Sequence, residues 1–234
     1  RPKVQKIFDK EIYAYDAIGN YEYYEGLGNG YDENDNWVLD FGKLDENKEP
    51  EEKVDVVIIN YPEGDGNNSV ISADYNEDKI VMEMAEKELI INCNSDYSGG
   101  FGIIVDDSYS IDSGGAITIN NVGNMDIKAN VNSGQAAAIY AEGSGSSIKI
   151  FTAKNDNIVT LEANDTLGKY AVLNAIGGAN VEINGKVNIT KTNGNEAVIV
   201  QGNGSEVKLG GGVIGGADDE VAIRLVDDGK ITIN

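Results

Sequence analysis

Short stretches of alternating apolar and polar residues fill the chain from Gly99 onward, separated by turns rich in Gly, Asn, Asp and Ser. Alternation with a period of two places every second side chain on the same face of a β-strand. The stretches form three series that recur in a fixed order along the chain. In the first series a small residue leads an apolar run, at 101–105, 137–141, 171–175, 197–201 and 222–226. The second series lies at 116–119, 148–150, 181–183, 207–209 and 231–233, and the third at 125–129, 158–162 and 187–190.

The spacing of these series predicts the fold. Counted between the leading small residues Gly102, Ala137, Ala171, Ala197 and Ala222, the repeats are 35, 34, 26 and 25 residues long. Three short strands in roughly 25 residues make one coil of a parallel β-helix, in which each coil buries its inward side chains by stacking on its neighbours. The longer repeats are then one coil with an inserted loop. An antiparallel sandwich also has short strands, but it does not explain the fixed order of the three series. We therefore expect an all-β protein, a right-handed parallel β-helix with three strands per coil.

The composition divides the chain into two regions. Residues 1–65 hold 7 of the 12 Tyr, the single Trp and 17 of the 40 acidic residues. We interpret 1–65 as an aromatic, acidic N-terminal segment that caps the first coil or is inserted before it, and 66–234 as the β-helix coils. The last apolar strand is not followed by a polar cap, so we expect the coils to continue beyond residue 234.

Aromatic residues of the first region are the candidate binding residues. They are Tyr21, Tyr23, Tyr24, Tyr31 and Trp37. Tyr and Trp dominate the energetically important positions of recognition surfaces. The same segment could instead cover the core of the first coil, and one segment can do both.

Asp32, Asn34 and Asn36 place side-chain oxygens at alternate positions, as at the start of a calcium-binding loop. Such a loop has Gly at its sixth place and Glu at its twelfth, where this chain has Trp37 and Lys43. The three residues are candidate Ca²⁺ ligands, with an ordinary Asx turn as the alternative. No other cofactor is expected.

Charge and composition limit the chemistry. The net charge of −22 disfavours nucleic acid and anionic membrane surfaces as partners, and no apolar run is long enough to cross a membrane as a helix. The chain has no His, and its only Arg residues are Arg1 and Arg224. Acidic pairs at 106–107, 218–219 and 227–228 lie in turns, without matching acids in the intervening coils. We therefore expect no catalytic residues and no enzymatic activity.

Residues 171–175, followed by 181–189, resemble the passenger domains of autotransporter adhesins. The resemblance covers roughly residues 70–234 and is one of coil length, Gly/Asn turns, acidity and scarce Cys. Such passengers are secreted through an outer-membrane β-barrel and displayed as β-helical stalks that mediate attachment, aggregation or biofilm growth, and so contribute to virulence.

The resemblance implies an extracellular location on a bacterial surface, anchored in the outer membrane through a C-terminal part that this sequence does not include. It implies an adhesin that binds a host glycan, a matrix protein or another copy of itself. Two alternatives stay open. One is a Ca²⁺-dependent carbohydrate-binding or pectin-lyase-like β-helix, and the other is a structural spike or stalk.

Overall fold

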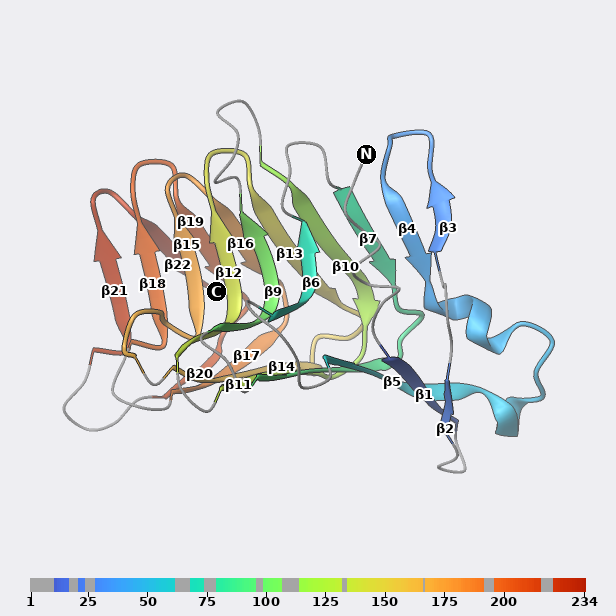
Figure 1. The fold of residues 1–234 in the computed structure, drawn as a ribbon. Coiled ribbons are helices and arrows are strands. Elements are labelled where there is room, and N and C mark those ends of the chain that lie inside the picture. Colours follow the sequence, from blue (N-terminus) through green and yellow to red (C-terminus); the bar gives the residue numbers. More distant parts are fainter. Residues whose placement is uncertain are drawn as a thin grey trace.

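The computed structural model describes residues 11–16, 21–23, 28–61, 68–73, 79–95, 99–106, 114–131, 134–165, 167–191, 196–215 and 221–234. In this part of the chain, short strands form three sheets (Figure 1). The sheets run along one long axis and enclose a common core. Sheet A contains β1 (Glu11–Asp16), β2 (Tyr21–Tyr23), β5 (Val54–Tyr61), β8 (Glu88–Ser95), β11 (Met125–Val131), β14 (Ile158–Asn164), β17 (Lys186–Lys191) and β20 (Gly212–Ile214).

Sheet B contains β3 (Gly28–Tyr31), β4 (Trp37–Asp40), β7 (Lys79–Glu83), β10 (Ala116–Val122), β13 (Ser147–Thr152), β16 (Asn180–Ile183), β19 (Glu206–Leu209) and β22 (Lys230–Ile233). Sheet C contains β6 (Asn68–Ala73), β9 (Gly99–Asp106), β12 (Gln135–Glu142), β15 (Leu173–Ile176), β18 (Val198–Gln201) and β21 (Ile223–Val226). Two short 3₁₀ helices, η1 (Phe41–Asp45) and η2 (Pro50–Glu52), connect β4 to β5.

From β4 onward the chain passes through sheets B, A and C in turn and then begins again in sheet B. Strands inside the stack pair in parallel with the equivalent strands of the coils before and after them, as β10 does with β7 and β13. The chain is thus a right-handed parallel β-helix with three strands per coil, and the predicted fold class is confirmed. The first, second and third series of the sequence are the strands of sheets C, B and A.

The strand register corrects two of the four predicted repeat lengths. In sheet C, Ile103 pairs with Ile139, then Leu173, Val198 and Ile223 follow, so the repeats are 36, 34, 25 and 25 residues rather than 35, 34, 26 and 25. The difference arises because Ala137 and Ala171 each lie one position before the residue that is equivalent to Gly102, Ala197 and Ala222. The N–H groups of Ala138 and Ile139 both donate to the carbonyl oxygen of Val172, each at 3.0 Å, so two successive residues share one partner.

The core consists of rows of buried side chains, in which equivalent residues of successive coils lie one after another along the axis. In sheet B one such row is Leu39, Met82, Ile119, Ile150, Ile183 and Leu209, each at most 1% exposed. The alternation of strand residues creates the row, because every second side chain points inward and the parallel register repeats that position in each coil. The row continues to Ile233, which is 49% exposed, since β22 pairs only with β19 among the strands that the structure describes.

The N-terminal end of the stack is finished by antiparallel strands. β1 pairs with β5 and with β2 at the edge of sheet A, and β3 pairs with β4 at the edge of sheet B. β4 and β5 themselves pair in parallel with β7 and β8, so the coils already begin at Trp37, inside the region interpreted as a cap. None of the described helices is long and apolar enough to cross a membrane.

Candidate functional site

Three aromatic rings meet on the outer surface of sheet C. Tyr140 points outward, because its neighbours Ile139 and Ala141 belong to the main core whereas Tyr140 packs in a separate cluster with Phe101. Tyr170 completes the group from the segment between β14 and β15. The ring centroids are 5.0 Å apart for Tyr140 and Tyr170, 5.6 Å for Phe101 and Tyr140, and 5.7 Å for Phe101 and Tyr170. We call Phe101, Tyr140 and Tyr170 the aromatic cluster.

Asp165 builds the loop that presents Tyr170. Asp165 is 2% exposed, and its carboxylate accepts backbone hydrogen bonds from Leu167 at 3.2 Å, from Lys169 at 2.7 Å and from Tyr170 at 2.6 Å. Three N–H groups that converge on one buried side chain fix the path of the loop. The position of Tyr170 therefore follows from Asp165 and not from a strand.

Carboxylates surround the aromatic cluster. The hydroxyl of Tyr140 donates to Oε2 of Glu142 at 3.0 Å, and Glu142 lies in register with Asp106 on the neighbouring strand. Burial raises the pKa of Tyr140 above its usual range, and the charge of Glu142 raises it further. Burial likewise raises the pKa of Tyr170, with further contributions from the charges of Glu142, Asp165 and Asp106. Both phenols therefore stay protonated at neutral pH, in a negative local field.

This arrangement is suited to binding. Phe101 and Tyr140 are 8% and 7% exposed, so they form a rigid support, while Tyr170 remains partly exposed. A partly exposed aromatic face offers apolar area at low entropic cost, and the carboxylates can accept hydrogen bonds from a ligand that donates them. A ligand with an apolar face and hydroxyl or amine donors fits this combination.

The structure brings together two of the five predicted aromatic binding residues. Tyr31 and Trp37 contact each other edge to face, with ring centroids 4.8 Å apart, at the edge of sheet B. Tyr21 and Tyr23 lie in β2 at the edge of sheet A, and Tyr24 lies outside the described residues. A binding role for these residues stays a prediction.

The predicted calcium ligands form a compact turn. Oδ1 of Asp32 accepts hydrogen bonds from the backbone N–H of Asn34 at 2.8 Å and of Asn36 at 2.9 Å, and Oδ2 accepts one from Nδ2 of Asn36 at 3.0 Å. These bonds, led by those from Asn36, lower the pKa of Asp32. These bonds form an Asx turn, and a role of the three residues as Ca²⁺ ligands stays a prediction. Within the described ranges, no group of three or more His, Cys, Asp or Glu is placed to hold a metal ion.

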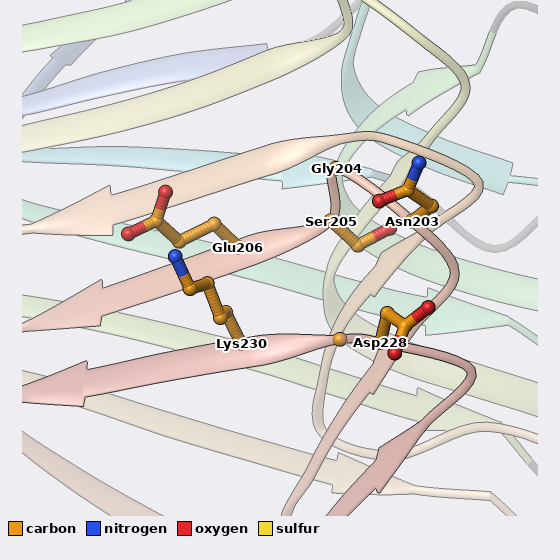
Figure 2. Close-up of a pocket in the computed structure, with 7 residues that line it drawn as sticks. Asn203, Gly204, Ser205, Glu206, Asp228 and Lys230 are labelled. Carbon is orange, nitrogen blue, oxygen red and sulfur yellow. The ribbon is translucent and has the colours of Figure 1, made fainter.

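A pocket of 540 Å³ lies where sheet C turns into sheet B (Figure 2). We call it the corner pocket, and its lining residues are Asn203, Gly204, Ser205, Glu206, Asp228, Gly229 and Lys230. Glu206 and Lys230 extend toward each other from the paired strands β19 and β22, while Asn203 and Asp228 lie on the two turns. Ser205 anchors the upper turn, since its hydroxyl donates to the carbonyl of Gln201 at 2.6 Å and accepts from the N–H of Gly178 at 2.7 Å.

The acidic pair Asp227-Asp228 forms part of the lower turn of this pocket. Both residues have a left-handed backbone, with φ of 49° and 67°, where the turn two coils earlier has Gly177 at 65° and Gly178 at 97°. Asp tolerates this region better than most residues because its short side chain can hydrogen-bond locally. Both aspartates are exposed, in agreement with the expected solvated turn.

The aromatic cluster was not among the residues predicted from the sequence. Its three members come from different coils: the strand register brings Phe101 and Tyr140 together, and the loop held by Asp165 adds Tyr170. The sequence does contain one indication of it: Tyr140 is the only aromatic residue in the apolar stretch 136–141. Comparison with protein-family models, with curated proteins and with solved structures gave no match to this chain. The fold is therefore shown by the strand pairing, and the function has to be inferred from the geometry of the surface.

Proposed function

We propose that this chain is a non-catalytic binding segment of a bacterial cell-surface adhesin, in which the β-helix is the stalk and the aromatic cluster contacts the ligand. The ligand class is a host glycan or an extracellular protein. The observation that carries the proposal is the contact of Phe101, Tyr140 and Tyr170 on the outer face of sheet C, beside Glu142. Large rings on an outward face, next to carboxylates, suit recognition better than they suit solvation.

The location on a cell surface is supported by the resemblance of the coils to autotransporter passengers. The stacking itself supports the stalk, because each coil contacts only its neighbours and the protein can extend without enlarging its core. The net charge of −22 supports solubility outside the cell and disfavours nucleic acid as a partner.

A glycan and matrix-protein array tests the proposal, probed with the 234-residue chain in the presence and absence of Ca²⁺. Tyr170→Ala removes the partly exposed ring, and Ile158→Ala is the matched control, because Ile158 is an apolar side chain 43% exposed on sheet A. We expect array binding that Tyr170→Ala abolishes and Ile158→Ala preserves.

Three outcomes would overturn the assignment of the site. Array binding that survives Tyr170→Ala would exclude the aromatic cluster. Binding that requires Ca²⁺ and is lost in Asp32→Ala would favour a Ca²⁺-dependent carbohydrate binder. An array without any signal, together with self-association measured by light scattering, would favour attachment between copies of the chain.

A further inference from the structure

Two Asn-Gly steps have described side chains, and the structure constrains them very differently. Asn203-Gly204 lies on the turn above the corner pocket, and Asn184-Gly185 lies between β16 and β17. We propose that Asn203 is a site of spontaneous deamidation, which changes the charge of the corner pocket, while Asn184 is protected by the fold. This proposal is independent of the proposed ligand contact at the aromatic cluster.

The reaction needs only water. The backbone nitrogen of Gly204 loses its proton to hydroxide and attacks Cγ of Asn203. A new N–Cγ bond forms, the bond from Cγ to Nδ2 breaks, and ammonia leaves. Water then opens the cyclic imide to give aspartate or isoaspartate, with no oxidation or reduction. A glycine at the next position favours the attack, because no Cβ shields its nitrogen and its backbone adopts the required conformations easily.

Asn203 meets the geometric conditions for this attack. Asn203 and Gly204 are both exposed, and the side chain of Asn203 makes no hydrogen bond to any residue that the structure describes. The flanking Gly202 and Gly204 have φ of 101° and 83°, which only glycine adopts at little cost. An exposed tip of this kind is where chains are most open to local rearrangement.

Asn184 does not meet the geometric conditions for this attack. Its Oδ1 accepts hydrogen bonds from the N–H of Thr152 at 2.8 Å and from Oγ1 of Thr152 at 3.4 Å, which hold the side chain on the neighbouring coil. The following Gly185 is buried, and a Cβ there would lie 2.7 Å from the side chain of Thr152. The turn therefore has to open before the nitrogen of Gly185 can reach Cγ.

Deamidation alters the corner pocket directly. Its charged residues are Glu206, Asp228 and Lys230, and Figure 2 shows the amide of Asn203 on the same side as Asp228. Conversion of Asn203 to aspartate changes the net charge of the lining residues from −1 to −2, which strengthens the attraction of the pocket for cations. Isoaspartate also lengthens the backbone next to Ser205, which holds Gly178 through its hydroxyl.

The experiment incubates the native 234-residue chain at mildly alkaline pH and follows both sites by peptide mapping. Cleavage after Glu releases 197–206, in which Asn203 is the only Asn, and trypsin releases 170–186, in which Asn184 is the only Asn followed by Gly. We expect Asn203 to convert about tenfold faster than Asn184 in the native protein, and the two rates to become similar in denaturant.

Asn203→Gln is the control variant, because its longer side chain would have to close a six-membered ring. In this variant the peptide 197–206 should show no conversion, while the protein keeps its β-sheet circular dichroism. Conversion of Asn203 no faster than that of Asn184 in the native protein would overturn the proposal. So would conversion within 197–206 that proceeds at the same rate in Asn203→Gln.

Discussion

Lys87 is the residue whose environment gives the sharpest stability prediction. Its side chain is 3% exposed, and Nζ donates both to Oδ2 of Asp45 and to the carbonyl oxygen of Val54, the latter at 2.6 Å. Oδ1 of Asp45 accepts the N–H of Val54 at 2.7 Å, and the Asp45 side chain is 22% exposed. The pair joins the connection between β4 and β5 to the corner between β7 and β8, so it links the first two coils.

Removal of either partner leaves the other residue unpaired. Because Lys87 is more deeply buried than Asp45, the two substitutions should lower the free energy of unfolding by different amounts. Asp45→Ala leaves a buried ammonium without its counter-charge, which should cost about 3–5 kcal/mol. Lys87→Met keeps the volume and leaves a partly exposed carboxylate that water can reach, so it should cost only about 1–2 kcal/mol. The double variant no longer buries a charge, and we expect it to be more stable than Asp45→Ala alone.

Urea unfolding followed by circular dichroism measures these differences, with the midpoint compared at a constant slope. Lys128→Ala is the control, because Lys128 and Glu162 lie 4.0 Å apart with side chains 49% and 33% exposed, and its effect should stay under about 1 kcal/mol. A double variant as unstable as Asp45→Ala, or less stable, would refute the argument that an unpaired buried ammonium is the dominant cost.

Three further predictions concern the core, the loop and the phenols. Ile150→Ala should destabilise by about 2–5 kcal/mol because it empties a fully buried position, whereas Ile233→Ala, at a position 49% exposed in the same row, should cost under about 1 kcal/mol in urea unfolding; equal costs would contradict the inward row. Asp165→Ala should lower the near-ultraviolet circular dichroism of the tyrosines and cost about 1–3 kcal/mol, with the far-ultraviolet spectrum retained; an unchanged near-ultraviolet spectrum would show that Asp165 does not position the loop. Ultraviolet titration should show that Tyr140 and Tyr170 ionise above their usual pKa of 10.0. Since the unfolded chain loses these protons first, stability from the two phenols is full below pH 10.0 and falls as the pH rises above it, and normal titration of both would refute their burial.

The three-strand repeat could be predicted because it depends on local patterns. Ile117, Ile119, Ile148 and Ile150 alternate with polar residues, and this alternation decides which side chains point inward without reference to the other coils. The short corners are also visible in the sequence, because positive φ at Gly177 and similar positions requires residues of this kind.

The exact alignment of each strand with the equivalent strand of the next coil could not be predicted from the sequence. Residues 136–138 are all Ala, so the sequence does not show which of them is equivalent to Gly102. A shift of one residue exchanges the inner and outer faces of a strand, so the sequence alone could not place Tyr140 outside. The first coil was missed for a different reason, because η1 and η2 separate β4 from β5 and hide the regular spacing.

The position of Tyr170 depends on an interaction that sequence patterns do not reveal. Asp165 precedes Tyr170 by five residues and holds it through the backbone, and the residue types alone do not show this hydrogen bond. Tyr31 and Trp37 were singled out from their residue types, and the structure adds that their rings touch.

The most direct test of the proposed function is the dissociation constant of the strongest array ligand for four proteins: the unaltered chain, Tyr170→Ala, Tyr31→Ala and Ile158→Ala. If the aromatic cluster contacts the ligand, Tyr170→Ala should weaken binding about tenfold or more, equivalent to about 1.4 kcal/mol, and the other two variants should change it by less than about twofold. Loss of affinity in Tyr31→Ala with none in Tyr170→Ala would move the site to the edge of sheet B and contradict the account.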